Sequence, residues 1–539
     1  MTVEVRTPRL SADAVQSIEQ LVADRVASRI FAQDPTLWGS EAEAEARIRL
    51  GWTDVFDRAD ALIPEVLAHA GGLAELGVDR IVLCGMGGSS LAPEVITRAA
   101  GVDLVVLDST HPAQVRRAVE TDLQRAAVVV SSKSGSTIET RSQLALFEEA
   151  FTAAGIDPAE RIVIVTDPDS ALEAHARERG ERVFLADPNV GGRYSALTAF
   201  GLVPSALAGA DVAAVVAEAR TVVGLVASDD IENPALVLAA AYAQGAPEVY
   251  TTAVAETRHS TAWGLADWIE QLIAESTGKQ GRGLLPIAVG ADDPEVGDDY
   301  AGPAPLTLVG PEGSGSAAPD RAIVVTAPLG AQLIVWETAT AVLGRLLGID
   351  PFDQPDVESA KVAAREVLGT SAGSAPAIGT LSSESQVSLL AAPSGSVLTN
   401  AASLIASLQE TVGADDYLVI QAYLDRDDRA AAPLAQLRAR LASLLGVPVA
   451  LGFGPRYLHS TGQFHKGGPK RGVFLQILDD ATPDLAIPGS EGGFAALLSA
   501  QAQGDRDVLS GAGRPVFALR AADPAVLVDE LLRAGEIEA

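Results

Sequence analysis

Between residues 80 and 190, short apolar runs alternate with stretches of helical pattern. Such alternation is typical of a parallel sheet covered by its connecting helices. It also bears on function, because ligands bind at the carboxyl ends of the strands of such sheets. We therefore predict an α/β domain with a site at one edge of its sheet. The candidate strands are 80–84, 102–107, 127–130, 161–166 and 182–185.

Two unusual loops directly follow strands of this predicted sheet. Gly85–Ser90 (Gly-Met-Gly-Gly-Ser-Ser) follows the first strand, and its glycines allow a backbone to approach a ligand closely. Ser131–Thr140 (Ser-Ser-Lys-Ser-Gly-Ser-Thr-Ile-Glu-Thr) follows another strand and leads into a helix expected over 139–150. Backbone amides, hydroxyls, an ammonium and a helix N-terminus together can hold one phosphate. The alternative interpretation is a Ser-rich surface loop that ends in a helix cap.

Neither loop has the spacing of a nucleotide site. The first is neither G-x-G-x-x-G nor a Walker loop, so a dinucleotide site is not indicated. The two loops lie about 45 residues apart, which suits adjacent β–α units of one sheet.

The rest of the chain also predicts α/β structure. A helical N-terminal segment precedes the first sheet. A second alternating stretch has strands at 247–252, 304–309 and 322–326 and a long apolar helix over 329–347. After a Ser-, Gly- and Pro-containing linker at 370–376, a third part has strands at 416–423, 448–453 and 472–477 and a helix over 430–445. We expect domains at 1–220, 221–369 and 370–539.

Composition restricts the partners. The 71 acidic residues outnumber 39 basic ones, so nucleic acid is an unfavourable partner for a chain of net charge −32. The only cysteine is Cys84, which excludes a disulfide framework and fits a reducing, cytoplasmic compartment. No signal-peptide pattern and no uncharged run of about 18 apolar residues are present, so we expect no membrane segment.

Two further motifs could carry chemistry. In Gly191–Ser195 (Gly-Gly-Arg-Tyr-Ser), two glycines place Arg193 on a tight turn, where a guanidinium could stabilise a developing oxyanion. A surface arginine in a salt bridge is the alternative.

Glu275 lies in the last turn of a helix that should end at Gly278. The helix dipole there disfavours a carboxylate, which suits a proton shuttle. The alternative is an ordinary terminal Glu paired with Lys279.

Polar side chains also gather in two later segments. Gln354 and Lys361 are seven apart and share a face if helix connects them. His459, Gln463, His465 and Lys466 form the second group. No Cys or clustered carboxylate accompanies these histidines, so acid–base or anion-contact roles are favoured over a metal site.

Taken together, these motifs resemble the phosphoglucose isomerase family, which is built from two sugar-isomerase (SIS) domains. The match runs in order through Gly-Gly-Ser, Ser-Lys-Ser…Thr-Ile-Glu-Thr, Gly-Gly-Arg-Tyr-Ser, Glu-Ser-Thr-Gly-Lys and Phe-Asp-Gln…Lys. The resemblance implies interconversion of glucose 6-phosphate and fructose 6-phosphate through a cis-enediol, within glycolysis and gluconeogenesis. It implies no metal or organic cofactor, and a homodimer.

The resemblance also implies residue roles. Arg193 would stabilise the enediolate, Glu275 would move the proton between C1 and C2, and Lys361 would help near the ring oxygen. The residues that would bind the sugar and its phosphate are Gly88, Ser89, Ser132, Lys133, Ser134, Thr137 and Gln354.

In one place the chain departs from this pattern. The family has a ring-opening His between the base Glu and the Phe-Asp-Gln segment, but residues 276–352 contain none. His459 begins a His-Ser-x-x-Gln segment much later in the chain. Our hypothesis is that the third part brings His459 into the site, from the same chain or from a partner subunit. That part resembles the end of isomerases fused behind transaldolase.

Other functions stay open at this point. A non-catalytic SIS protein that binds sugar phosphates would explain the loops but not Arg193, Glu275 and Lys361. An isomerase that also accepts mannose 6-phosphate or another sugar differs only in contacts that the sequence does not reveal. A transferase or amino-sugar enzyme on SIS domains would want a lysine Schiff base or an ammonia source, and no cysteine suited to a glutaminase is present.

Overall fold

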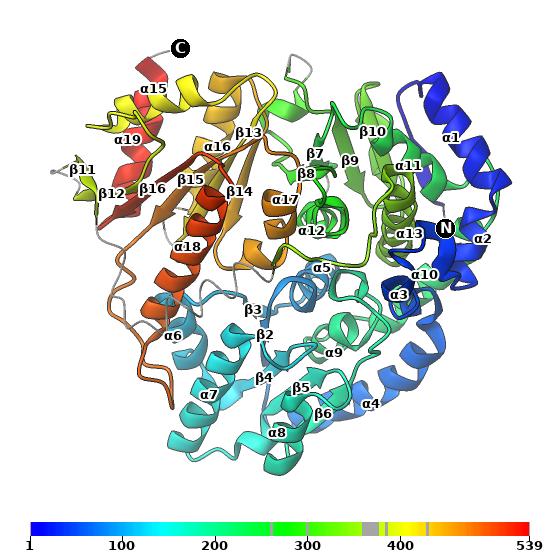
Figure 1. The fold of residues 1–539 in the computed structure, drawn as a ribbon. Helices are drawn as coiled ribbons and strands as arrows, with labels where there is room; N and C mark the ends of the chain where they lie inside the picture. The colour runs from blue at the N-terminus through cyan, green and yellow to red at the C-terminus, as the bar shows by residue number, and fades with distance from the viewer. Residues whose placement is uncertain are drawn as a thin grey trace.

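The computed structural model describes residues 2–258, 262–297, 300, 302–357, 377–382, 386–426, 429 and 431–537. Three sheets, each flanked by helices, form the molecule (Figure 1). This confirms the predicted α/β class. In the view of Figure 1 the first sheet lies at the bottom, the second at the upper right and the third at the upper left.

The first sheet is parallel throughout, with the order β3-β2-β4-β5-β6. All six residues of its central strand β4 are buried, because helices cover both faces, and its run of three valines suits that position. The strands are β2 (Arg80–Gly85), β3 (Val105–Leu107), β4 (Ala126–Ser131), β5 (Ile162–Thr166) and β6 (Arg182–Leu185). The helices are α4 (Phe56–Glu75), α5 (Leu91–Ala100), α6 (Pro112–Glu120), α7 (Ile138–Ala153), α8 (Ala171–Arg179) and α9 (Ala199–Leu207).

The second sheet has the order β1-β10-β9-β7-β8, with only β1 antiparallel. Strand β1 lies near the N-terminus. The predicted domain 1–220 places it with the first sheet, but β1 pairs with β10 of the second sheet. The strand predicted at 247–252 exists but is shifted: β7 begins only at Thr251, so the two overlap at Thr251 and Thr252. Pro247 has no N–H group to donate to a neighbouring strand, and the apolar pattern of β7 continues to Ala255. The strands are β1 (Glu4–Arg6), β7 (Thr251–Glu256), β8 (Leu285–Ala288), β9 (Leu306–Gly310) and β10 (Ala322–Thr326). The helices are α1 (Ala12–Ala23), α2 (Val26–Phe31), α3 (Glu43–Ala46), α10 (Val212–Val226), α11 (Pro234–Ala243), α12 (Leu265–Thr277) and α13 (Leu329–Leu347).

The third sheet has the order β11-β12-β16-β15-β13-β14 and is parallel from β16 to β14. Its strands are β11 (Gly379–Ser382), β12 (Val387–Ala391), β13 (Tyr417–Tyr423), β14 (Val449–Phe453), β15 (Gly472–Leu478) and β16 (Val516–Ala521). Its helices are α15 (Ala401–Thr411), α16 (Ala431–Leu445), α17 (Gly462–Gly467), α18 (Phe494–Gly511) and α19 (Pro524–Ile537). The domain boundaries at 220 and 369 stay a prediction.

Charged side chains dock the third part on the first. Arg456 lies 2.9 Å from Glu94 and 2.7 Å from Asp108, and both carboxylates are buried. Burial alone would raise the pKa of Glu94, but the arginines around it hold that pKa at about 2. Arg117 forms a bidentate pair with Asp425. Helices α12 and α17 pack against each other near the centre of the molecule (Figure 1).

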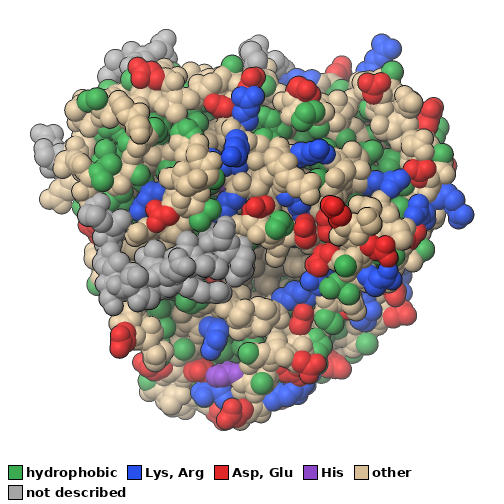
Figure 2. Space-filling view, in the orientation of Figure 1, with side chains coloured by type: hydrophobic (Ala, Val, Ile, Leu, Met, Phe, Trp, Pro, Cys, Tyr) green, Lys and Arg blue, Asp and Glu red, His purple; other side chains and the backbone are tan. Residues whose placement is uncertain are grey.

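Charged side chains of both signs also lie on the outer surface. Acidic and basic side chains are interspersed over the face shown in Figure 2. Among the described helices, none combines the length and the apolar character that crossing a membrane requires.

Candidate active site

Two loops leave the first sheet side by side. Strands β2 and β4 are parallel neighbours, and Gly85 at the end of β2 pairs with Ser131 at the end of β4. The loops that follow therefore start at the same edge of the sheet. This confirms that they belong to adjacent β–α units, as their spacing predicts.

The Gly-Gly-Ser loop is held by close backbone contacts. It forms a short 3-10 helix, Gly87–Ser89. A Cβ on Gly88 would lie 2.1 Å from the carbonyl oxygen of Gly192, in the loop that carries Arg193. Gly87 has φ +55, and a Cβ there would lie 2.3 Å from the carbonyl oxygen of His459. Glycines at both positions thus let three distant segments meet.

We expect Gly88→Ala to destabilise the folded protein by about 1–3 kcal/mol, because its methyl group would have to push backbone atoms apart. The midpoint of thermal unfolding measures this. Gly72→Ala is the matched control: Gly72 is exposed in α4 with nothing within 4 Å of a Cβ. That control should be neutral or stabilising by about 0.5–1 kcal/mol. Equal midpoints for the two variants would contradict the close approach.

The second loop gathers hydroxyls and one ammonium before α7. Ser132 donates to the hydroxyl of Thr137 at 3.2 Å, and Thr137 stands at the N-cap of α7 without a capping bond from its side chain. The hydroxyls of Ser134 and Ser136 lie 2.8 Å apart. Lys133 Nζ lies 2.5 Å from Asp167, and the Lys133 side chain is about a quarter exposed. All five side chains therefore surround one turn, next to a helix N-terminus.

Arg193 is buried rather than on the surface, with 4% of the residue exposed. Its Nε donates to Ser276 Oγ at 2.7 Å, and one Nη donates to the carbonyl oxygens of Pro351 and Asp353. The other Nη donates to Gln354 Oε1 at 3.2 Å and lies 3.4 Å from Glu275 Oε1. The guanidinium is thus held in place beside the carboxylate that the sequence indicates as a base.

The turn that carries Arg193 is anchored by aromatic packing. Tyr194 is 1% exposed and stacks on Trp52, with ring centroids 5.4 Å apart. Its other neighbour is Phe352, at 5.5 Å. The N-terminal helical segment and the Phe-Asp-Gln segment therefore clamp the 3-10 helix Gly192–Tyr194 from two sides.

Glu275 lies in the last turn of α12, as predicted, and only 7% of it is exposed. Gln271, one turn earlier, donates to Glu275 Oε2 at 3.0 Å. Lys279 does not serve as its partner: Lys279 Nζ donates instead to the carbonyl oxygen of Asp350 and to Asp353. One carboxylate oxygen of Glu275 therefore faces Arg193, and the other is bound by an amide.

The third part of the chain reaches this site. Gly278, just after α12, would place a Cβ 2.3 Å from the Cα of Phe464 in α17. Gln463 donates to the carbonyl oxygen of Gly278 at 2.8 Å and to Asp356 at 2.7 Å. The His-Ser-x-x-Gln segment thereby docks on the end of the helix that carries Glu275. The role of His459 in the site, from the same chain or from a partner subunit, stays a prediction.

His459 is connected to both loops and to α12. Its carbonyl oxygen accepts a hydrogen bond from Gln271 at 2.9 Å. Its Nε2 lies 2.9 Å from Oε1 of Glu139, the buried Glu of Thr-Ile-Glu-Thr. Gln501 of α18 donates to the same oxygen at 2.7 Å and accepts from Thr110 at 2.7 Å. The imidazole is therefore oriented by a carboxylate that is itself held in place.

Comparison with known proteins identifies the family of the chain. A family model described as phosphoglucose isomerase matches residues 50–282. A relative from Natronomonas pharaonis, "Probable glucose-6-phosphate isomerase", is 31% identical over 418 residues, which cover 67% of this chain and 94% of the relative. The chain belongs to the phosphoglucose isomerase family.

Other members and solved structures are similar over part of the chain. "Glucose-6-phosphate isomerase" of Synechococcus elongatus is 32% identical over 347 residues, 53% of this chain and 66% of the relative. A crystal structure of a glucose-6-phosphate isomerase from Chlamydia trachomatis shares the fold, with TM-score 0.54 and 20% identity, over 68% of this chain and 88% of that one.

The family model ends shortly after Glu275. It includes both loops, Arg193 and Glu275, whereas Gln354 and His459 lie beyond residue 282. Lys361 lies outside the described residues. The family match thus spans one part of the candidate site, whereas Gln354 and His459 come from segments outside it.

The sequence missed four side chains of this site. Glu139 stands inside a motif that was singled out, but its burial could not be seen. Gln271 could have been found, because it lies four residues before Glu275 and so shares its helix face. Ser276 directly follows the expected base. Gln501 carries no local signal at all.

Proposed function

We propose that this chain is a glucose-6-phosphate isomerase that interconverts glucose 6-phosphate and fructose 6-phosphate. The observation that carries the proposal is the pair Arg193–Glu275, 3.4 Å apart and buried, at the edge where the two loops begin. A protein that only binds sugar phosphates needs the loops but has no use for a buried base beside a fixed guanidinium.

The first step is opening of the sugar ring. A proton must reach the ring oxygen while the hydroxyl at the anomeric carbon loses one, which leaves an open-chain carbonyl. His459 is the candidate acid, because Glu139 at 2.9 Å can stabilise its imidazolium form. By resemblance, Lys361 acts near the same oxygen.

The second step is proton transfer between C2 and C1. Glu275 takes the proton from the carbon next to the carbonyl, which leaves a cis-enediolate, and returns it to the neighbouring carbon. The negative charge on the enediolate oxygens is stabilised by Arg193, whose other contacts hold the guanidinium still. The oxidation of one carbon is balanced by the reduction of its neighbour, and the proton that one hydroxyl loses is returned at the other oxygen, so the reaction needs no redox cofactor.

The loops place the substrate for both steps. Ser132, Lys133, Ser134 and Thr137 bind the 6-phosphate at the N-terminus of α7, and Lys133 exchanges Asp167 for the phosphate. Gly88 and Ser89 line the sugar. Gln354 also contacts the sugar, and its side chain is held by the hydrogen bond that it accepts from Arg193.

We expect Arg193→Lys to lower kcat about 10²-fold with little change in KM, because lysine keeps a charge but cannot make the same set of hydrogen bonds. A coupled assay of glucose 6-phosphate formation measures both constants. Arg220→Lys, on the half-exposed surface pair with Asp60, is the control and should behave as the wild type. A pure KM effect would mean that Arg193 binds substrate without stabilising the enediolate.

The test of the function itself is turnover of fructose 6-phosphate by the purified chain with a chelator present. Mannose 6-phosphate is assayed in parallel to define the substrate range. Turnover that the chelator does not reduce would support the metal-free enediol reaction. Binding of fructose 6-phosphate without turnover would instead favour a non-catalytic sugar-phosphate-binding protein.

The proposal extends to the compartment, the oligomeric state and the partners of the enzyme. The single, buried Cys84 fits a cytoplasmic enzyme, and the family resemblance suggests a homodimer. The acidic net charge argues against a nucleic-acid partner.

A further inference from the structure

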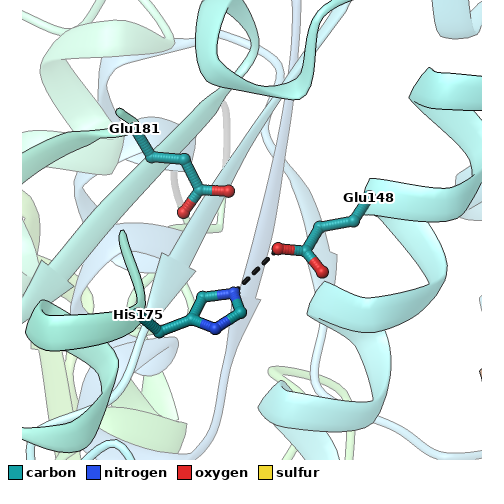
Figure 3. A group of neighbouring side chains, drawn as sticks. All are labelled: Glu148, His175 and Glu181. Atoms are coloured by element: carbon teal, nitrogen blue, oxygen red, sulfur yellow. Dashed lines mark hydrogen bonds and ion pairs between the residues drawn. The ribbon is translucent and has the colours of Figure 1, made fainter. Parts of the chain in front are cut away.

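Three side chains from three segments of the first domain face one another (Figure 3). None of them belongs to the proposed active site. Glu148 comes from α7, His175 from α8, and Glu181 from the turn that leads into β6. One potential ligand atom from each lies within 4.8 Å of the other two. His175 Nε2 is 2.8 Å from Glu148 Oε1.

Glu181 is the unusual member of this cluster. Its side chain is completely buried, yet neither carboxylate oxygen has a hydrogen-bond partner among the described residues. The nearest cation, Nε of Arg179, is 4.0 Å away. A buried carboxyl without partners is costly, so something that binds it is expected to stabilise the fold.

We propose that Glu148, His175 and Glu181 bind one divalent transition-metal ion of the zinc type. Imidazole and carboxylate together suit Zn²⁺ and its neighbours rather than Mg²⁺, which prefers oxygen ligands. Two ionised carboxylates also balance the charge of a divalent ion. Ligand atoms at about 2.1 Å from one ion lie at most about 4 Å apart, so small side-chain rotations complete the set.

Arg179 is the competitor for this site. Its Nε lies 2.7 Å from Glu148 Oε1, but its side chain is 44% exposed. Losing such a half-exposed ion pair costs little, so an ion can displace the guanidinium into water. The arginine also fails to reach Glu181 within hydrogen-bond distance, and a metal ion would satisfy both carboxylates at once.

The ion would act on structure rather than on the reaction. Glu148 is nine residues along α7 from Glu139, roughly 13 Å at the rise of an α-helix. A bound ion would join α7, α8 and the start of β6. Helix α7 begins next to the proposed phosphate loop, so the ion would stiffen the framework behind that loop.

The experiment is calorimetric titration of the chelator-treated full chain with Zn²⁺, with thermal unfolding measured on the same samples. We expect saturation at one ion per chain at this site and a higher unfolding midpoint, and no such effect with Mg²⁺. His175→Ala and Glu181→Gln should each weaken Zn²⁺ binding by at least about tenfold. His69→Ala, a histidine elsewhere on the same domain, should not.

Arg179→Ala separates the proposal from a general loss of folding. It removes the competitor, so it should tighten Zn²⁺ binding while His175→Ala weakens it. The proposal is overturned if the wild type shows no saturable binding, if His175→Ala binds Zn²⁺ as the wild type does, or if Arg179→Ala binds more weakly.

Discussion

Replacing Glu275 by Gln should lower kcat for fructose 6-phosphate by about 10²–10⁴-fold, the usual contribution of a positioned acid–base group. Glutamine has nearly the same shape, and its amide oxygen can still accept a hydrogen bond from Arg193, but it cannot take a proton from carbon. KM should therefore change little. The coupled assay gives the rate, and proton exchange between substrate and heavy water follows the carbon–hydrogen step directly.

Glu270→Gln is the matched control for this variant. Glu270 lies on the same helix and accepts a hydrogen bond from the amide of Ala288. Burial raises its pKa to about 8, so the carboxyl is largely protonated at neutral pH and an amide imitates it well. Near wild-type rates are expected for Glu270→Gln. If Glu275→Gln kept its activity and its exchange, another group would have to be the base.

The second large effect is expected from His459→Ala, which should lower turnover of fructose 6-phosphate by at least about 10²-fold. His459 is proposed to act only in ring opening. The variant should therefore turn over a substrate that is already open as fast as the wild type does. The 5-deoxy analogue of fructose 6-phosphate is such a substrate, because it lacks the hydroxyl that closes the furanose ring. Rates on the two substrates, with wild type and variant, give the measurement.

Alanine is the appropriate replacement at this position. It keeps the Cβ and the carbonyl group, which pack against Gly87 and accept from Gln271. His69→Ala serves as the control and should change neither rate. Equal losses on the cyclic and the open substrate would show that His459 holds the site together instead of opening the ring.

Much of this site could be predicted from local sequence. Valine-rich runs that end in Gly-Gly-Ser or in serines and lysine place two loops at one sheet edge, because parallel strands present their carboxyl ends together. The helix that carries Glu275 is amphipathic and ends at a glycine, so its last turn could be identified. The helix predicted over 329–347 coincides with α13, because a long apolar run there ends at Gly348.

Tertiary structure alone decided the rest. His459 and Gln501 each lie more than 300 residues from Glu139 along the chain, yet both bind the same oxygen of its carboxylate. No local sequence pattern predicts these contacts, because they depend on how the third part docks through Arg117, Arg456 and α17. The pairing of β1 with β10 depends likewise on a distant partner strand. The sequence by itself determined the elements and the chemical groups at their ends, because backbone propensity and hydrophobic period are local. Which of those groups meet was determined only by packing between distant surfaces.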